Sequence, residues 1–259
     1  MRLNGKAARA SDRVAEGDVI EYAMPDARPA AKAFAEAIPL DVVYEDQDLV
    51  VINKAAGMVV HPAPGHHEGT LVNALLGLGG EWSSTGGEMR PGIVHRLDLG
   101  TSGLIVAARN NAAHRGLAAQ LRDRTLSRTY LAIVRGRVKD DAGELEGPIG
   151  RHPRERKRMA VVEGGRFART RYQVVERKRT HTLLRCELDT GRTHQIRVHL
   201  AALGHPVAGD DDYGGREARA GRPMLHAWRL RMHHPRTGEE LMFEAPPPED
   251  FNLFWGSVI

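Results

Sequence analysis

The sequence predicts an α+β fold, in which a mixed and mostly antiparallel sheet is flanked by helices. Its strand-like segments are short and numerous, and several are separated by hairpin-length turns, which favours this class over a doubly wound sheet. Of the 259 residues, 41% are hydrophobic and 27% are charged, the composition of an ordinary soluble protein that can bury a core. We therefore expect one large domain, with room for a small appendage.

The first forty residues differ in character from those that follow. Residues 1–24 predict short strands and turns, because they contain the tight-turn pair Asn4-Gly5 and later the turn Glu16-Gly17-Asp18. Residues 25–39 contain three prolines and an alanine-rich stretch, which predicts a linker able to carry a short helix. We expect the main domain to span residues 40–259.

The first half of the main domain predicts a hairpin, then a helix, a strand and a second helix. Asn110 can cap the second helix, in which Ala113, Leu117 and Leu121 recur at every fourth position and so share a face. In chain order, the expected elements are strands at 42–44 and 49–53, a helix at 70–78, a strand at 104–108 and the helix that begins after Asn110.

The second half predicts further strands and one helix. Residues 130–134 are apolar at both parities, as in a strand with both faces covered, whereas residues 182–188 alternate between apolar and charged side chains, as in a strand with one wet face. Residues 193–203 predict a helix with Ile196, Leu200 and Leu203 on one side. Short strands near Leu230 and at 241–243 are expected to close the chain.

The charge is unevenly distributed. The chain has 37 Lys and Arg residues against 33 Asp and Glu residues, a net charge of +4, but residues 91–200 hold 23 basic side chains against 11 acidic ones. Such an excess predicts a polyanion partner, while solvated arginine-rich loops are the alternative. The residues of the densest cluster that could neutralise phosphates are Arg154, Arg156, Lys157 and Arg158.

Several classes of protein are excluded. The apolar stretch at 103–108 is too short to span a membrane, and no apolar segment of a secretory signal follows the N-terminus. The single cysteine, Cys186, cannot form an internal disulfide, so we expect a cytoplasmic protein. Phosphate-loop, dinucleotide-binding and serine-hydrolase motifs are absent. His194 and His199 would point about 140° apart on a helix, so we expect no metal site.

Asp98 lies on a glycine-flanked turn immediately before a buried strand, where loops display reactive groups on a rigid scaffold. A lone aspartate beside a glycine usually caps its turn, but here the neighbours form the pattern His-Arg-Leu-Asp-x-x-Thr-Ser-Gly over residues 95–103. This pattern resembles the RluA family of RNA pseudouridine synthases. The resemblance covers most of residues 40–248, and further segments that carry it are 50–62, 128–134, 191–199 and 204–215.

The resemblance implies a pseudouridine synthase fold with a central RNA-binding cleft, and an isomerase that needs no cofactor. Such an enzyme breaks the N1–C1′ bond of uridine, turns the base over and joins C5 to C1′. Cleavage builds positive charge on the sugar, which a carboxylate can stabilise or trap, and Asp98 fits this role. The sequence is compatible both with attack of Asp98 on C1′ and with removal of a sugar proton.

The resemblance also assigns roles to residues far apart in the chain. Arg197 is expected to pair with Asp98, and Tyr130 to stack on the flipped base and to help move the C5 proton. Ile196 is expected to close the other side of the base, and Arg96 to occupy the stack that the flipped nucleotide leaves. The further candidates for RNA binding are His95, Arg192 and the four cluster residues Arg154, Arg156, Lys157 and Arg158.

Three short segments, at 59–62, 150–153 and 225–227, resemble members of the family that modify large-subunit (23S) ribosomal RNA. We therefore expect this RNA as the partner of a monomeric enzyme. Residues 1–24 resemble only the C-terminal half of the S4 RNA-binding module that such members carry. The pattern departs from the family at Leu99-Gly100, where Lys followed by an acidic residue is usual.

Three alternatives fit some of the same residues. A pseudouridine synthase that acts on tRNA would carry the same motifs. A non-catalytic RNA-binding or ribosome assembly protein would use the same basic groove, although the presence of Asp98, Tyr130 and Arg197 together argues against it. A glycoside hydrolase would use Asp98 and Asp189 as its carboxylate pair and would release free base or sugar.

Overall fold

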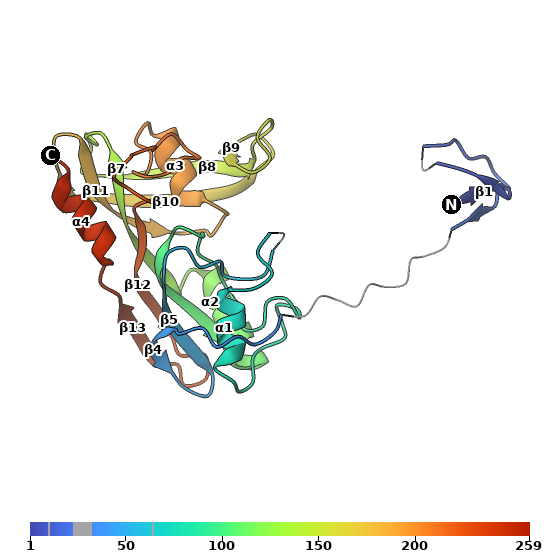
Figure 1. Cartoon of the computed structure of the whole chain (residues 1–259), viewed down its shortest axis with the longest axis horizontal. Coiled ribbons are helices and arrows are strands. Elements are labelled where there is room, and N and C mark those ends of the chain that lie inside the picture. The colour runs from blue at the N-terminus through green and yellow to red at the C-terminus, as the bar shows by residue number, and fades with distance from the viewer. Residues whose placement is uncertain (10, 23–32, 64) are drawn as a thin grey trace. The chain divides into compact units, whose positions relative to one another are not determined.

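The computed structural model describes residues 1–9, 11–22, 33–63 and 65–259, and the chain divides into two units, Met1–Lys32 and Ala33–Ile259 (Figure 1). In the first unit, β1 (Arg2–Leu3), β2 (Lys6–Ala7) and β3 (Ile20–Glu21) form a sheet in the order β2-β1-β3. Asn4 and Gly5 join β1 to β2 with positive φ angles of 51° and 76°, as the tight-turn pair predicts. Its likeness to an S4 module stays a prediction.

The predicted linker falls partly outside the described residues, which omit 23–32. Its second half, 33–39, has no helix and lies against the second unit. The Asn73 side chain donates to the carbonyl of Phe34 at 2.9 Å, and the Glu36 amide donates to the carbonyl of Asn73 at 3.0 Å. Residues 33–39 therefore belong to the second unit.

The second unit is an α+β structure built on one large sheet, which confirms the predicted class. Its strands follow the order β4-β5-β6-β12-β7-β11-β10-β8-β9, with β13 also paired to β12, and among the described strands of this sheet only β6 and β12 are parallel. The elements are β4 (Asp41–Glu45), β5 (Leu49–Lys54), α1 (Leu71–Gly77), β6 (Ser102–Ala108), α2 (Asn111–Asp123), β7 (Ser127–Arg135), β8 (Ala142–Arg151), β9 (Met159–Val161), β10 (Arg166–Arg177), β11 (His181–Leu188), α3 (Gln195–Ala202), β12 (Leu225–His233), β13 (Glu240–Glu244) and α4 (Glu249–Ser257).

Helices cover both faces of the sheet, and alternation along the central strands divides the core between them. On β7, Tyr130 packs in the cluster that includes α1 and α3, whereas Ile133 packs in the cluster with α4. On β6, Ile105 joins the α1 and α3 cluster and Leu104 joins the α2 cluster. Figure 1 shows α3 beside β8 and β10, and α1 and α2 near β5.

The parallel pairing of β6 with β12 depends on a glycine. Gly103 has a φ of 108°, and a Cβ at this position would lie 2.2 Å from the carbonyl oxygen of Ala227 on β12. No side chain fits this approach, and φ is in the region that favours glycine. Gly103 thereby lets β6, which follows the Asp98 turn, sit in the centre of the sheet.

The predicted elements are present, with Asn110 as the N-cap of α2, and the structure adds four more: β8, β9, β10 and α4. The expectation that strands close the chain is wrong, because α4 follows β13 and buries Phe251 and Phe254. Leu203 was expected on the buried side of its helix, but it is the C-cap of α3 and is exposed. Among the described helices, none has the length and apolar character needed to cross a membrane.

Candidate active site

A pocket of about 400 Å³ lies where the loop before β6 meets the start of α3. Residues 93–98 and 191–196 form most of its wall, and β7 contributes Arg128 and Tyr130. The pocket therefore joins segments that lie about a hundred positions apart in the sequence. The predicted site residues that line it are His95, Arg96, Asp98, Tyr130, Arg192 and Ile196.

The turn that carries Asp98 is fixed through its backbone. The Thr101 amide donates to the Asp98 carbonyl at 3.0 Å, and Arg222 donates to the Gly100 carbonyl, also at 3.0 Å. A Cβ at Gly100 would approach the Pro223 ring to 2.8 Å, so a larger residue would force the two segments apart. The glycine found where the family pattern has an acidic residue thus permits this close contact, and the turn holds the Asp98 side chain at 16% exposure.

His95 holds the same loop against β6. The backbone amide of Val106, on β6, donates to Nε2 of His95 at 3.1 Å. Burial, reinforced by the charge of Arg128, lowers the pKa of His95 to about 3, so the ring is neutral near pH 7 and can accept this bond. The structure thus gives His95 a role in fixing the loop, and its contact with RNA stays a prediction.

Arg197 is the centre of a network of three carboxylates. It is 6% exposed, and its Nε and Nη2 bond the two oxygens of the buried Asp210 at 2.6 and 2.8 Å. Nη2 also bonds Asp212 at 2.9 Å, whereas Nη1 lies 3.5 Å from Asp98. The guanidinium lies over the ring of Tyr213, 4.9 Å from its centroid. Arg197 is thus held by Asp210 and presents its remaining nitrogen to Asp98.

The predicted ion pair of Arg197 with Asp98 is present at 3.5 Å, but Asp210 is the closer partner. Burial acts to lower the pKa of Arg197, but the bonds and charges of Asp210, Asp98 and Asp212 together outweigh burial and raise that pKa, so the side chain is always charged. Two parallel bonds to one carboxylate are the strongest geometry open to arginine, and Asp210 has them. Asp98 therefore faces a cation whose close partner is another residue, and its own carboxylate stays accessible from the pocket.

His194 approaches Asp98 from the other side. Its Nε2 lies 3.9 Å from Oδ1 of Asp98, and its Nδ1 lies 2.8 Å from the hydroxyl of Tyr213, which also accepts the amide of Met159 at 2.9 Å. The residue immediately precedes α3 and has a left-handed backbone, with φ of 57°. Burial lowers the pKa of His194, although the charge of Asp98 opposes this.

Apolar and aromatic groups form the walls of the pocket. Tyr130 on β7 is 5% exposed and Ile196 on α3 is 4% exposed, and both line it. Burial raises the pKa of Tyr130, opposed by the charge of Arg128, so the phenol keeps its proton at neutral pH. Arg128 is itself buried beside Gly191, where a Cβ would lie 2.9 Å from its guanidinium. A flat base can fit between such walls.

Five arginines also line the pocket, and among its described lining residues Asp98 is the single carboxylate. Arg96 is exposed, while Arg192 is half-buried and donates to the carbonyl of Phe167 at 3.1 Å. The five arginines are Arg90, Arg96, Arg122, Arg128 and Arg192. Their positive charges suit the phosphates of a polyanion, and the single carboxylate suits a substrate carbon on which positive charge develops.

The predicted basic cluster lies on the connection between β8 and β9, outside the lining of the pocket. Arg154, Arg156 and Lys157 are exposed. Arg158 differs, because it pairs with Glu155 at 2.9 Å and its guanidinium lies over the Tyr213 ring, 5.3 Å from the centroid. Three of the four cluster residues are therefore free to meet a phosphate, and the fourth is engaged within the protein.

Asp189, the second carboxylate of the hydrolase alternative, does not line the pocket. It pairs with Arg171 and, at 3.6 Å, with Arg169, both on β10. The structure therefore does not bring Asp189 and Asp98 together as a catalytic pair in this pocket.

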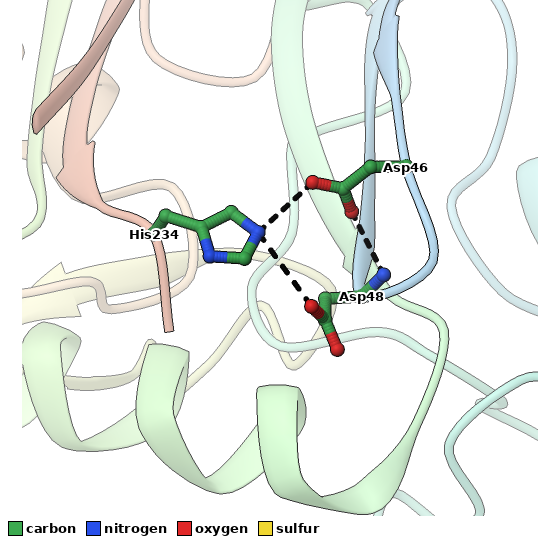
Figure 2. A group of neighbouring side chains, drawn as sticks. All are labelled: Asp46, Asp48 and His234. Carbon is green, nitrogen blue, oxygen red and sulfur yellow. Dashed lines mark hydrogen bonds and ion pairs between the residues drawn. The ribbon is translucent and has the colours of Figure 1, made fainter. Parts of the chain in front are cut away.

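One group of described side chains has the composition of a metal site: Asp46, Asp48 and His234 (Figure 2). Nε2 of His234 lies 2.9 Å from Asp46 and 3.7 Å from Asp48. Its Nδ1 accepts the backbone amide of Thr237 at 3.1 Å, so Nε2 carries the proton and donates to Asp46. Asp48 is bonded by Arg236 at 2.6 Å and by Asn110 at 2.8 Å. These bonds tie the β4–β5 turn to the loop after β12.

Sequence reasoning gave no role to several residues at the site. Asp210, Asp212 and Tyr213 lie in a segment that carried the family resemblance, but an Asp-rich turn reads as solvated surface. Lys54 is 1% exposed, donates to the carbonyls of Ala55 and Met58, and has its pKa lowered to about 7 by burial, with Asp98 opposing. For each of these residues, the only feature of the sequence that indicated a role was its position inside a segment that carries the family resemblance.

Comparisons with known proteins agree with this site. Residues 48–202 match the sequence model of the family described as RNA pseudouridylate synthase. An uncharacterised RNA pseudouridine synthase of Bacillus subtilis is 47% identical over 249 residues, which cover 96% of this chain and 82% of that protein. The ribosomal large subunit pseudouridine synthase D of Nitrosomonas europaea is 46% identical over 257 residues, which cover 96% of this chain and 74% of that protein.

A solved structure shows the same fold. Human RNA pseudouridylate synthase domain containing 1 superposes with a TM-score of 0.67 at 30% identity, over 83% of this chain and 86% of that one. The Asp98 turn and the start of α3 lie within the segment that the family model matches, and the alignment with the Bacillus subtilis protein covers nearly the whole chain. The chain therefore belongs to the RNA pseudouridylate synthase family.

Proposed function

We propose that the chain converts uridines of large-subunit ribosomal RNA into pseudouridine, with Asp98 at the reacting sugar. The observation that supports this most strongly is the position of Asp98, the single carboxylate in the described lining of a pocket that five arginines share. The arginines suit the phosphates on either side of the target nucleotide. The carboxylate suits the sugar carbon, on which positive charge develops when the N1–C1′ bond breaks.

The pocket walls suit the uracil while it is detached. The uridine must leave its stack before Asp98 can reach the sugar, and the buried pair Tyr130 and Ile196 offers two surfaces between which a base can be held. Held there, the base turns until C5 faces C1′ and the new bond forms. C5 then loses its proton while N1 gains one from solvent. We assign the hydroxyl of Tyr130, which lines the same pocket, to relaying the C5 proton: its oxygen takes that proton as its own hydrogen passes to water.

Large-subunit RNA is proposed as the substrate on the strength of relatives. The proteins named ribosomal large subunit pseudouridine synthase D from Nitrosomonas europaea and Pseudomonas aeruginosa are 46% and 47% identical to this chain. The exposed residues Arg154, Arg156 and Lys157 provide further positive charge for a large folded RNA.

The experiment compares RNA from cells with and without the gene. Carbodiimide mapping of pseudouridines in large-subunit RNA should reveal sites that vanish on deletion and return with the wild-type gene, but not with Asp98→Asn. Transfer RNA from the same cells provides the matched comparison. Sites that vanish from tRNA and persist in ribosomal RNA would contradict the proposed substrate while leaving the isomerase activity intact.

A further inference from the structure

We propose that His194 is a positioning residue for the isomerisation: when RNA fills the pocket, its Nε2–H donates to the Asp98 carboxylate, and the hydroxyl of Tyr213 holds it in the tautomer that makes this possible. The proposal concerns the reaction at Asp98 and rests on the isomerase function. It does not depend on which RNA is modified.

The two oxygens of Asp98 face two different donors. Oδ2 lies 3.5 Å from Nη1 of Arg197, and Oδ1 lies 3.9 Å from Nε2 of His194. Catalytic hydrogen bonds are often long in a free enzyme and shorten when substrate expels water from the site. A carboxylate held at both oxygens has a fixed plane, and this orientation is needed whether Asp98 attacks C1′ or removes a sugar proton.

The position of the histidine proton follows from the bonds of Tyr213. The tyrosine oxygen accepts the Met159 amide at 2.9 Å, and our proposal assigns its own hydrogen to Nδ1 of His194, 2.8 Å away. Since burial lowers the pKa of His194, the ring is neutral near pH 7 and carries one proton. With Nδ1 acting as an acceptor, that proton is on Nε2, the nitrogen that faces Asp98.

The surroundings of His194 are strongly charged. The ionisable groups that face it are Asp98, Arg197, Asp210, Asp212 and Tyr213, and Arg197 bonds both Asp210 and Asp212. Tyr213 meets the histidine ring edge-on, with centroids 5.7 Å apart, so packing and hydrogen bonding fix the ring in one orientation.

The backbone supports a specific role for this side chain. His194 occupies the N-cap position of α3 without capping it, and it has φ of 57° and ψ of 21°. A non-glycine residue in this region is strained, and such strain persists where the surroundings enforce it. The side chain instead bonds Tyr213 and faces Asp98.

The first test replaces the histidine with a residue that tolerates the same backbone. His194→Asn suits a left-handed conformation, and its amide is too short to replace the Nε2 donor. We expect kcat, measured by tritium release from RNA labelled at C5 of uridine, to fall roughly 10- to 100-fold, as for loss of a hydrogen bond to a charged group, with KM unchanged. His205→Asn, at a half-buried site outside the pocket, is the matched control.

The second test asks whether Tyr213 acts through His194. Tyr213→Phe keeps the ring but removes the hydroxyl, so kcat should fall in the wild-type background and change less than about twofold in the His194→Asn background, because the two residues act as a unit. Tyr172→Phe, at a buried tyrosine outside the pocket lining, is the control. Fully additive losses would overturn the proposal, as would wild-type kcat in His194→Asn.

A third measurement does not require a variant to fold or any RNA to be modified. The ¹⁵N chemical shifts of the imidazole of His194 in the wild-type protein at pH 7 should show a protonated Nε2 and an unprotonated Nδ1. The opposite tautomer, or a doubly protonated ring, would contradict the proposal. A protein that shows the expected tautomer but modifies no RNA would instead contradict the enzymatic function.

Discussion

The ion pair between Arg197 and Asp210 should contribute more to the free energy of unfolding than the longer contact between Arg197 and Asp98. Arg197→Met removes both guanidinium bonds to Asp210, which is fully buried, and leaves that carboxylate without its cation. Removing one partner of a buried ion pair costs on the order of 3–5 kcal/mol. The free energy of unfolding of Arg197→Met, measured by urea denaturation at pH 7.5, should fall by about this amount.

A second substitution in that background identifies the stranded charge. Asp210→Asn neutralises the carboxylate without changing its shape, so Arg197→Met with Asp210→Asn should regain most of the lost stability. Asp98→Asn in the same background should regain little, because Asp98 lies 3.5 Å from Arg197 and lines an open pocket. Equal recovery from the two substitutions, or greater recovery from Asp98→Asn, would refute the assignment of Asp210 as the close partner.

Three further predictions concern RNA binding, pH and metal. Replacing Arg154, Arg156 and Lys157 with Gln should weaken RNA binding and lower the slope of log affinity against log salt by about 2. The control, Arg158→Gln, should change that slope less, because Glu155 already pairs with Arg158. An unchanged slope in the triple variant would place the three residues outside the interface. In the folded protein the pKa of His95 is lowered to about 3, whereas in the unfolded chain it returns to its ordinary value of 6.5. Between these two pH values only the unfolded chain binds the proton, so the free energy of unfolding decreases as pH falls from 6.5 towards 3. His95→Gln should reduce the pH slope of the unfolding free energy by about 1.4 kcal/mol per pH unit in that range, and an unaltered slope in an acid titration would show that His95 is not buried in its neutral form. Dialysis against EDTA should leave uridine conversion intact once the magnesium that folds the RNA is restored, and activity that returns only with zinc would contradict this.

Much of the fold could be predicted because hydrophobic periodicity is strong in the central strands and in α2. Residues 130–134 on β7 and 182–188 on β11 follow the predicted patterns of burial. β10 gives no such signal, because its inward positions include Ala168 and Thr170, which are small or polar. Thr170 is buried because it bonds Gln195 and His199 on α3, and these contacts exist only in the tertiary structure.

The C-terminal helix was missed for a different reason. α4 has nine residues and follows a run of three prolines, and its described buried side chains are Phe251 and Phe254 alone. Two apolar positions three apart do not define a helical period. Its docking against Ile133, on the far face of β7, supplies the stability that the local sequence does not show.

The site itself was only partly predictable. The Asp98 turn is visible as a local motif, but the approach of Arg197, 99 positions away, followed from the family resemblance and from no periodicity. Sequence reasoning paired these two residues and missed Asp210, because an Asp-rich turn normally lies in solvent. Which of three neighbouring aspartates is buried depends on how the turn after α3 folds back onto Arg197.

The most direct test of the central claim measures binding and conversion together for Asp98→Asn. The amide keeps the shape of the side chain and loses the charge that stabilises the sugar as the N1–C1′ bond breaks. With large-subunit RNA labelled at C5 of uridine, the variant should bind with wild-type affinity and salt dependence, while tritium release stays at background. Tritium release near the wild-type rate would contradict the assignment of the reaction to Asp98.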